Sequence, residues 1–356
     1  MNYRPTKAII NLNHIYDNYI HATSTSNKKI IPVVKADAYG HGLKEVVSFL
    51  IKKGINYFAV SLIEEALEIR ALNKEVDILV MGVVDEFMFK VLSDQHLTFT
   101  IHTYKIKDAL VKSDLNLKCH IKFDSGMHRL GLTKTDEVYD LMQALKHKDN
   151  INIEGIYTHF ATADSDITYY QKQLRLFQSL IHNLPYDVKM IHASNSSSTL
   201  KYEHAITETT HSRLGISLYG LSLDEDQSHL KPAFKLITQV VEIKALKKND
   251  YLGYGITYQA FEDEIIAILP LGYADGLIRK NQGGYVEING NKYEIVGRVC
   301  MDQTFVKIDA NVNIGDEVII MGSNLITIDD VAKRLGTINY EIVCLISKRV
   351  PRIYIK

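Results

Sequence analysis

The feature that most constrains the fold is a regular alternation of short apolar runs with amphipathic stretches. Apolar, β-branched runs of four or five residues are typical of buried parallel strands, and the amphipathic stretches between them predict crossover helices. Eight such units can close into a (β/α)8 TIM-type barrel of about 250 residues. The predicted strands are residues 30–34, 57–60, 78–81, 97–101, 119–123, 153–157, 190–193 and 215–218.

The stretches between these runs predict helices with one apolar face. Ser61 with Glu64 has the spacing of a capping box at the start of one of them. An open doubly wound sheet is the alternative, but it would usually carry a G-x-G-x-x-G turn after an early strand, and the chain has none. The predicted helices are residues 43–53, 62–72, 136–146 and 167–184.

From about Lys231 the pattern becomes strand-rich, with Asn289-Gly290 as a tight hairpin turn. One helix is predicted between a capping pair, Thr327 with Asp330, and a terminating Gly336. We therefore expect an α/β barrel over residues 1–230 and a mostly β domain over residues 231–356, with an edge strand at 7–12 able to pair with the second domain. The predicted strands of this part are 236–245, 265–269, 285–288, 293–299, 305–308 and 318–321.

Charge and composition exclude several classes of protein. The formal net charge is −1 and no basic block stands out, so nucleic acid and anionic membranes are not expected partners. No apolar run approaches the roughly 20 residues that span a bilayer, and the N-terminus does not resemble a signal peptide, so we expect a cytoplasmic protein. Cys119, Cys300 and Cys344 lack C-x-x-C spacing, and we expect free thiols and no metal site.

Lys35 is the first candidate catalytic residue. It lies between an apolar run and the predicted turn Ala36-Asp37-Ala38-Tyr39-Gly40-His41-Gly42. The carboxyl ends of barrel strands carry the chemistry of such folds. A desolvated lysine tends toward the neutral amine, which can form a Schiff base with an aldehyde. Tyr39 and the glycines could then hold a phosphate. The alternative is a lysine whose ammonium reaches water.

Residues 33–42 resemble the pyridoxal-phosphate lysine signature of the alanine racemases, and the resemblance extends over nearly the entire chain. A second motif resembles the family's K-x-D-T-G-M-x-R-L-G, with serine in place of threonine. It is Lys122-Phe123-Asp124-Ser125-Gly126-Met127-His128-Arg129-Leu130-Gly131. The resemblance implies an isomerase that interconverts L- and D-alanine on a pyridoxal 5'-phosphate aldimine and supplies D-alanine for cell-wall peptidoglycan.

In the barrel, the resemblance implies that Lys35 anchors the cofactor and acts as a catalytic base. Arg129 would bond the cofactor's phenolic oxygen and help bind substrate, beside a carbamylated Lys122. His159 would stack on the pyridine ring, and Asp164 would line the entrance corridor. Arg213 would face the pyridine nitrogen, and because a guanidinium cannot give up a proton there, the ring would be a weak electron sink. The residues implied for the phosphate are Tyr39, Ser196, Gly215 and Ile216.

In the second domain, Tyr254 and Tyr273 each lie among glycines, in Gly253-Tyr254-Gly255 and Gly272-Tyr273-Ala274. The resemblance implies that Tyr254 is the second catalytic base and that Tyr273 lies at the substrate gate. Met301 would lie near the substrate carboxylate. The remaining residues implied by the resemblance are Arg279 and Arg298 in the entrance corridor and Tyr340 on the phosphate.

Racemisation needs an acid/base group on each face of a planar carbanion, and the resemblance assigns these roles to Lys35 and Tyr254. In the family the two residues meet across a homodimer with shared active sites, which a closed twofold arrangement would supply twice. A serine racemase or one of broader specificity would have the same sequence motifs. An apolar pocket that accepts alanine rejects the added hydroxyl of serine only weakly. A non-catalytic pyridoxal-phosphate-binding protein and an amino-acid decarboxylase of similar architecture are two further candidate functions.

Overall fold

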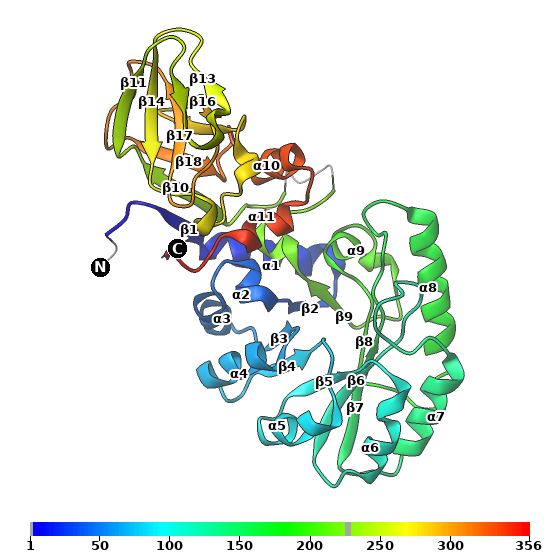
Figure 1. The fold of residues 1–356 in the computed structure, drawn as a ribbon. Helices are drawn as coiled ribbons and strands as arrows, with labels where there is room; N and C mark the ends of the chain where they lie inside the picture. The colour runs from blue at the N-terminus through cyan, green and yellow to red at the C-terminus, as the bar shows by residue number, and fades with distance from the viewer. Residues whose placement is uncertain (1–2, 225–228) are drawn as a thin grey trace. The chain divides into compact units, whose positions relative to one another are not determined.

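The computed structural model describes residues 3–224 and 229–356, and its chain divides into two compact units. We call Tyr16–Ala38 with Leu43–Leu230 the barrel body. We call the residues up to Ile15, Tyr39–Gly42 and Lys231–Lys356 the β body. Figure 1 shows the helices and strands of both.

The barrel body contains a sheet of eight parallel strands in the order β2-β9-β8-β7-β6-β5-β4-β3. The two outer strands of this order meet at a single parallel bridge between Val33 and Ala59, where Val34 N donates to Ala59 O at 2.9 Å. The predicted barrel is therefore confirmed. The strands are β2 Lys29–Pro32, β3 Tyr57–Val60, β4 Asp77–Val80, β5 Thr98–Ile101, β6 Leu117–Lys122, β7 Ile151–Tyr157, β8 Met190–His192 and β9 His211–Leu214.

The helices of this part follow the predicted βα alternation, which Figure 1 shows from α1 to α9. The predicted capping box was wrong by one residue, because Glu65, not Glu64, accepts from the backbone N–H groups of Ser61 and Leu62. The helices are α1 Leu12–Ser26, α2 Lys35–Tyr39, α3 Leu43–Lys52, α4 Ile63–Leu72, α5 Phe89–Asp94, α6 Lys107–Lys112, α7 Thr135–Leu145, α8 Ile167–Ile181 and α9 Ser196–Lys201.

Seven of the eight predicted barrel strands are observed within two residues of their predicted starts, but the eighth was wrong. Residues Ile216–Tyr219 form a short 3-10 helix, η4, and the strand is β9, which precedes it. The sequence pattern was misleading because β9 is polar, His211-Ser212-Arg213-Leu214, although all but its first residue are buried. Polar side chains in a barrel core are the exception to the usual filling by Val, Ile and Leu.

The β body is built on a nine-stranded sheet in the order β11-β14-β17-β16-β15-β18-β10-β1-β19. Strand β1 pairs with both β10 and β19, so it is an internal strand and the predicted edge position was wrong. The predicted run 236–245 is divided between two strands. The strands are β1 Lys7–Asn11, β10 Phe234–Gln239, β11 Glu242–Leu246, β14 Glu264–Leu269, β15 Tyr285–Ile288, β16 Asn291–Val296, β17 Thr304–Ile308, β18 Glu317–Met321 and β19 Arg352–Ile355, with a separate pair, β12 Tyr251–Leu252 and β13 Tyr258–Gln259.

The predicted turn and helix signals of the β body are confirmed. Asn289 and Gly290 both have positive φ, as the hairpin between β15 and β16 requires. Helix α10, Ile328–Leu335, begins at a Thr327/Asp330 capping box and ends at Gly336 in the left-handed conformation. A second helix, α11, covers Asn339–Leu345. Nowhere in the described chain is a helix both long and apolar enough to cross a membrane.

Candidate active site

Lys35 follows strand β2 and the bridge that closes the barrel, so it lies at the carboxyl ends of the barrel strands, as predicted. The next four residues, Ala36 to Tyr39, all have φ between 53° and 55°. This is a turn of left-handed helix, which costs roughly 1–2 kcal/mol for each L-residue. Such a backbone conformation persists only when its surroundings hold it in place.

Two carboxylates hold the left-handed turn. Ala36 N donates to Glu65 Oε1 at 2.6 Å, and the other oxygen of Glu65 accepts from Ser61 N at 2.9 Å and Leu62 N at 3.1 Å. At the far side of the turn, Asp37 Oδ1 accepts from the first backbone N–H of α3 at 2.8 Å. The backbone on the C-terminal side of Lys35 is therefore fixed to the starts of two helices.

Lys122 ends strand β6, and its side chain is buried with 4% relative exposure. Burial, and then the positive charges of Arg129 and Arg213, lower the pKa of its amine to about 8, with a smaller contribution from Lys35. Asp124 acts in the opposite direction. A minority of Lys122 amines, larger than for an ordinary lysine, is therefore neutral near physiological pH, and the neutral amine is the form that can take up carbon dioxide.

The loop after Lys122 is organised around the Asp124 carboxylate. Its Oδ1 accepts from the backbone N–H groups of Gly126, Met127 and His128, and its Oδ2 accepts from Arg129 N at 2.9 Å. Burial acts to raise the pKa of Asp124, but these four bonds outweigh it and lower the pKa. The backbone that carries Arg129 is thus held tightly, while the Arg129 side chain is exposed.

Arg213 lies on β9 inside the barrel core, with only 3% exposure. Its Nη1 donates to His192 Nδ1 at 2.6 Å, and its Nη2 donates to Thr158 O at 2.8 Å and Ala193 O at 2.9 Å. Its Nη2 also lies 3.4 Å from His159 Nδ1. Burial lowers the pKa of the guanidinium to about 10, so it stays a cation at neutral pH. Among the described residues no carboxylate accepts from it.

The basic residues of the barrel body act together on the imidazole of His159. Burial, followed by the charges of Arg213, Arg129, Lys122 and Lys35, lowers the pKa of its imidazole well below the usual value. His159 is therefore neutral. Two arginines and two lysines act on this one neutral ring, and we call these four basic residues the cationic pole, which fits an anionic ligand.

A second anion-binding feature lies where β9 enters η4. Ser196 Oγ accepts from Gly215 N at 3.0 Å and Ser217 N at 3.3 Å, which draws the start of α9 against this turn. Ser217 Oγ is buried and has no hydrogen-bond partner among the described residues. Hydroxyl and amide groups at a strand-to-helix turn, with a buried hydroxyl left over, fit a phosphate. The predicted set of Ser196, Gly215 and Ile216 is adjacent in space.

Two other predicted phosphate residues, Tyr39 and Tyr340, lie in the β body. Their ring centroids are 6.2 Å apart, and Tyr39 is buried with 8% exposure. The turn after Tyr39 needs glycine, because Gly40 has φ +78° and a Cβ there would lie 2.4 Å from Val343 O. The Tyr39 segment is therefore closely packed against helix α11.

Tyr254 belongs to an exposed glycine turn in the β body. Gly253 and Gly255 have φ of +71° and +72°, and a Cβ on Gly255 would lie 2.7 Å from the Arg298 guanidinium. The Tyr254 side chain is 72% exposed. The turn therefore presents the phenol to the outside of its own body and places the corridor candidate Arg298 directly behind it.

The gate candidates Tyr273 and Met301 lie on two loops that are bonded to each other. Tyr273 N donates to Cys300 O at 3.0 Å, and the next backbone N–H, of Ala274, donates to Met301 O at 3.1 Å. A Cβ on Gly272 would lie 2.2 Å from Cys300 O, so this contact requires glycine. Tyr273 is 41% exposed and Met301 52% exposed.

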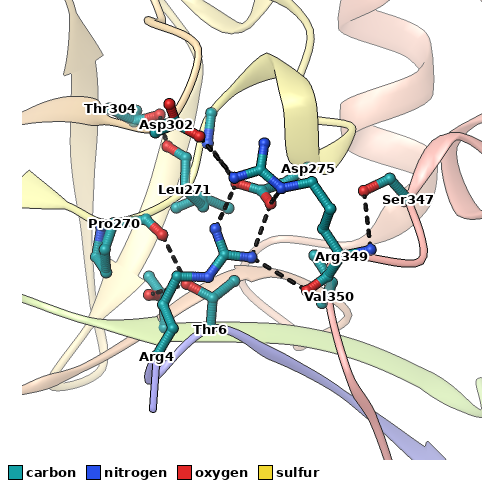
Figure 2. Close-up of polar contacts among 12 residues, drawn as sticks. Arg4, Thr6, Pro270, Leu271, Asp275, Asp302, Thr304, Ser347, Arg349 and Val350 are labelled. Carbon is teal, nitrogen blue, oxygen red and sulfur yellow. Dashed lines mark hydrogen bonds and ion pairs between the residues drawn. The ribbon is translucent and has the colours of Figure 1, made fainter. Parts of the chain in front are cut away.

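An ion-pair network supports these two loops, as Figure 2 shows. Asp275 is buried with 1% exposure, and Arg4 donates to both of its oxygens, at 2.7 Å and 3.0 Å. Gly272 N also donates to this carboxylate, at 3.0 Å. Arg349 joins the loops because its Nη2 donates to Asp302 at 2.7 Å while its Nε lies 3.8 Å from Asp275.

The remaining corridor candidates, Asp164 and Arg279, are both exposed, the first in the loop after β7 and the second in a short 3-10 helix, Arg279–Asn281. The barrel body thus gathers the candidates Lys35, Lys122, Arg129, His159, Ser196, Arg213, Gly215 and Ile216, and the β body gathers Tyr39, Tyr254, Tyr273, Arg279, Arg298, Met301 and Tyr340.

Sequence reasoning missed Glu65, His192 and His120 as members of the site. His192 accepts from Arg213, and its Nε2 lies 2.8 Å from His120 Nδ1. A signal was present, because polar residues at alternate positions in a buried strand, such as His120 and Lys122 of β6, share one face of the sheet. Glu65 had no comparable signal.

A closed parallel barrel with a lysine, a cationic pole and a phosphate-type turn at the carboxyl ends of its strands, followed by a β body, has the architecture of the barrel-type pyridoxal-phosphate enzymes. Family models described as the N-terminal and C-terminal domains of alanine racemase match residues 10–223 and 233–354. The chain belongs to the alanine racemase family. It is accordingly a pyridoxal-phosphate-dependent isomerase, a racemase.

Individual relatives agree with this assignment. An alanine racemase of Staphylococcus epidermidis is 35% identical over 366 residues, covering 99% of this chain and 95% of the relative. The crystal structure of alanine racemase from E. faecalis superposes with a TM-score of 0.94 at 34% identity and covers 99% of both chains. That of Bacillus anthracis, with bound L-Ala-P, has a TM-score of 0.92 at 35% identity and covers 100% of this chain and 96% of the other.

The same fold also occurs in a racemase for another amino acid. A histidine racemase from Leuconostoc mesenteroides subsp. sake superposes with a TM-score of 0.90 at 27% identity, covering 100% of this chain and 99% of the other. Fold alone therefore does not select alanine as the substrate.

Proposed function

We propose that this racemase interconverts L- and D-alanine by a two-base mechanism in which Lys35 and Tyr254 act on opposite faces of the substrate Cα. The observation that carries the proposal is the cationic pole of the barrel body, where Lys35, Lys122, Arg129 and Arg213 all act on the neutral His159. An anionic cofactor and a substrate carboxylate both fit such a pole.

The residues present fit pyridoxal phosphate. Ser196 with the backbone of Gly215 and Ile216 would hold the phosphate, together with Tyr39 and Tyr340, and His159 would pack against the ring. The buried Ser217 hydroxyl, which has no hydrogen-bond partner within the described part of the chain, supports an anion at this turn. Bound pyridoxal phosphate supplies an electron-withdrawing ring that acidifies the Cα–H of an amino acid joined to it.

The charge state of each basic residue sets its role. Arg213 keeps its protons, so it would bind the pyridine nitrogen without protonating it, which limits delocalisation and favours prompt return of a proton to Cα. Arg129 would bind the phenolic oxygen and the substrate. Lys122, whose pKa is lowered to about 8, would take up carbon dioxide, and the resulting anion would orient Arg129.

Tyr254 supports a homodimer with shared active sites. A catalytic phenol that is 72% exposed in its own body needs a covering surface before it can work on a desolvated substrate. A second copy of this chain supplies that surface twice in a closed twofold dimer. Tyr273, Met301, Arg279, Arg298 and the barrel residue Asp164 would then line the gate and the entrance corridor.

Alanine is favoured as substrate by the relative whose structure contains L-Ala-P, and serine is the closest competitor because it differs by a hydroxyl. We further propose that the protein works in the cytoplasm and supplies D-alanine for peptidoglycan. The negative formal charge and the lack of any membrane-spanning helix in the described residues are compatible with that location.

The test is formation of the D-enantiomer from L-alanine, L-serine, L-histidine and L-lysine, with Cα–H exchange followed in deuterated buffer. We expect L-alanine to be preferred, with exchange lost for one enantiomer in Tyr254→Phe and lost altogether in Lys35→Ala. Carbon dioxide release from lysine would indicate the decarboxylase instead. Cofactor absorbance without turnover of any amino acid would indicate a binding protein, and normal exchange of both enantiomers in both variants would exclude the two bases.

A further inference from the structure

A line of polar side chains crosses the core of the barrel, from the buried Arg213 to Tyr57, which is partly exposed. Barrel interiors are usually filled by Val, Ile and Leu. Here His120 and His192 are both fully buried. Arg213 Nη1 lies 2.6 Å from His192 Nδ1, His192 Nε2 lies 2.8 Å from His120 Nδ1, and His120 Nε2 lies 3.4 Å from the Tyr57 hydroxyl.

The direction of every hydrogen bond in this line follows from the arginine. A guanidinium only donates, so His192 Nδ1 must accept. Burial, and then the charge of Arg213, lowers the pKa of His192 well below its usual value, so the ring is neutral and its one proton is on Nε2. That N–H donates to His120 Nδ1, which places the proton of His120 on Nε2, facing Tyr57.

The barrel is adapted to hold His120 in this place. The register of β6 against β7 shifts between Cys119 and His120, so that His120 lies opposite Gly155. A Cβ on Gly155 would lie 2.8 Å from His120 Cε1, so a side chain there would displace the ring. On the other side, His192 stacks on Tyr157 with centroids 4.7 Å apart and an interplanar angle of 9°.

We propose that His120 is a positioning residue for Arg213, acting through His192. By accepting from His192 Nε2, His120 keeps the acceptor nitrogen of His192 turned toward Arg213. Without that acceptor, the proton of His192 could move to Nδ1, where it would meet the N–H of Arg213 and push the guanidinium away. The inference rests on the proposed function in one respect only, namely that the position of Arg213 matters for racemisation.

The test compares His120→Leu with His120→Asn. Leucine removes the acceptor, whereas the asparagine oxygen can stand close to the place of Nδ1 and accept from His192. In the holoenzyme with 15N-labelled histidine, the wild type and the asparagine variant should show a hydrogen-bonded Nε2–H of His192, and the leucine variant should lose it. The kcat for D-alanine formation should fall by about tenfold in His120→Leu, the scale of one buried hydrogen bond, with KM changed less and most of the loss restored in His120→Asn.

Tyr57→Phe is the matched control at the outer end of the line. Tyr57 lines a cavity of about 820 Å³ at the amino ends of β2, β3, β8 and β9, and its hydroxyl is the group of the line that is separated from Arg213 by both histidines. We expect its effect on kcat to be smaller than that of His120→Leu. A larger effect of Tyr57→Phe would overturn the proposed order of importance along the line.

Two results would overturn the proposal. One is a His192 proton on Nδ1 in the wild-type protein, which can be measured even if His120→Leu does not fold. The other is a folded His120→Leu protein with unchanged kcat. The histidine resonances do not depend on turnover, so an absence of racemisation in the wild type would contradict the proposed function while the tautomers still tested the proposed role of His120.

Discussion

The barrel body buries two of its basic site candidates, whereas the β body exposes three of its site candidates. In the barrel body, Arg213 and Lys122 are almost completely buried, and the polar side chains bond to one another and to the backbone. In the β body, Tyr254, Tyr273 and Met301 are between 41% and 72% exposed. The barrel body therefore organises Arg213 and Lys122 in advance within its own core, and the β body presents Tyr254, Tyr273 and Met301 outward.

This difference explains why the β body carries two glycines around Tyr254. A side chain that acts within the unit that carries it can be held by packing, as Arg213 is in the barrel body. A residue that works on another surface must project, and the positive φ of Gly253 and Gly255 allows the chain to expose Tyr254 on a tight turn. The comparison therefore predicts that the two halves meet between copies of the chain.

Mixing two inactive variants tests this prediction with the largest expected effect. Lys35→Ala and Tyr254→Phe should each lose nearly all racemase activity as homodimers. Mixed dimers should regain one working site, made of Lys35 from one copy and Tyr254 from the other, so an equal mixture should reach about one quarter of wild-type activity for a twofold dimer. Activity is measured after the two variants are unfolded and refolded together.

A matched control is the mixture of either variant with the double variant, which contains no complete site and should stay inactive. If the Lys35→Ala and Tyr254→Phe mixture also stayed inactive although mixed dimers formed, both residues would belong to the same copy. The contrast between the two bodies would then have another cause.

Acid should destabilise the barrel body more than the β body. Of 14 histidines, only His14 and His41 lie in the β body. The pKa values of His120, His159 and His192 are lowered, chiefly by burial, so below pH 6.5 the unfolded chain binds protons that the folded barrel does not. Stability is therefore lost as pH falls below about 6.5, and for His120, whose pKa is lowered to about 3, the loss reaches about 2 kcal/mol at pH 5.

Hydrogen exchange read by mass spectrometry between pH 5 and 7, corrected for the intrinsic pH dependence of exchange, measures this difference. We expect opening free energies to fall in β6, β8 and β9 before they fall in β10 and β18. Equal losses in both bodies would mean that the buried histidines do not control acid stability.

The smallest effect concerns the ion pairs of the β body. Arg4→Met removes the bidentate hydrogen bonds of the arginine to the buried Asp275 carboxylate. It should destabilise the β body by about 1–3 kcal/mol. Arg349→Met is the control, because Arg349 donates to the half-exposed Asp302 and lies 3.8 Å from Asp275, too far for a hydrogen bond, and exposed pairs contribute about 0–1 kcal/mol. Denaturant unfolding monitored at the β body compares the two, and equal effects would contradict the importance of burial here.

The sequence was sufficient to predict elements whose signal is local. The hairpin at Asn289-Gly290 and the capping box at Thr327 are examples, because turn and cap chemistry is contained in a few neighbouring residues. The position of β9 was missed because Arg213 and its neighbours are polar, and only the tertiary structure shows that they face other polar groups. The internal position of β1 depends on its pairing with β19, at the opposite end of the chain.

The candidate site shows the same distinction between features with a local sequence signal and features that depend on tertiary contacts. Lys35, Lys122 and Arg213 could be named from sequence motifs, but their common electrostatic effect on His159 depends on how β6, β9 and the turn after β2 fold together. Glu65 could not be found at all, since its bond to Ala36 N joins residues 29 positions apart and serves a backbone conformation that no local pattern predicts.

That backbone conformation has a consequence for the handedness of the residues it contains. Ala36 and Ala38 have φ and ψ near +53°, which for an L-residue are strained but for its mirror image are the ordinary angles of a helix. Immediately after Lys35, the chain of a racemase therefore holds two L-alanines in the shape that D-alanine prefers. Glycine at these positions would remove the strain, but it would also remove the stiffness that holds Lys35 in place.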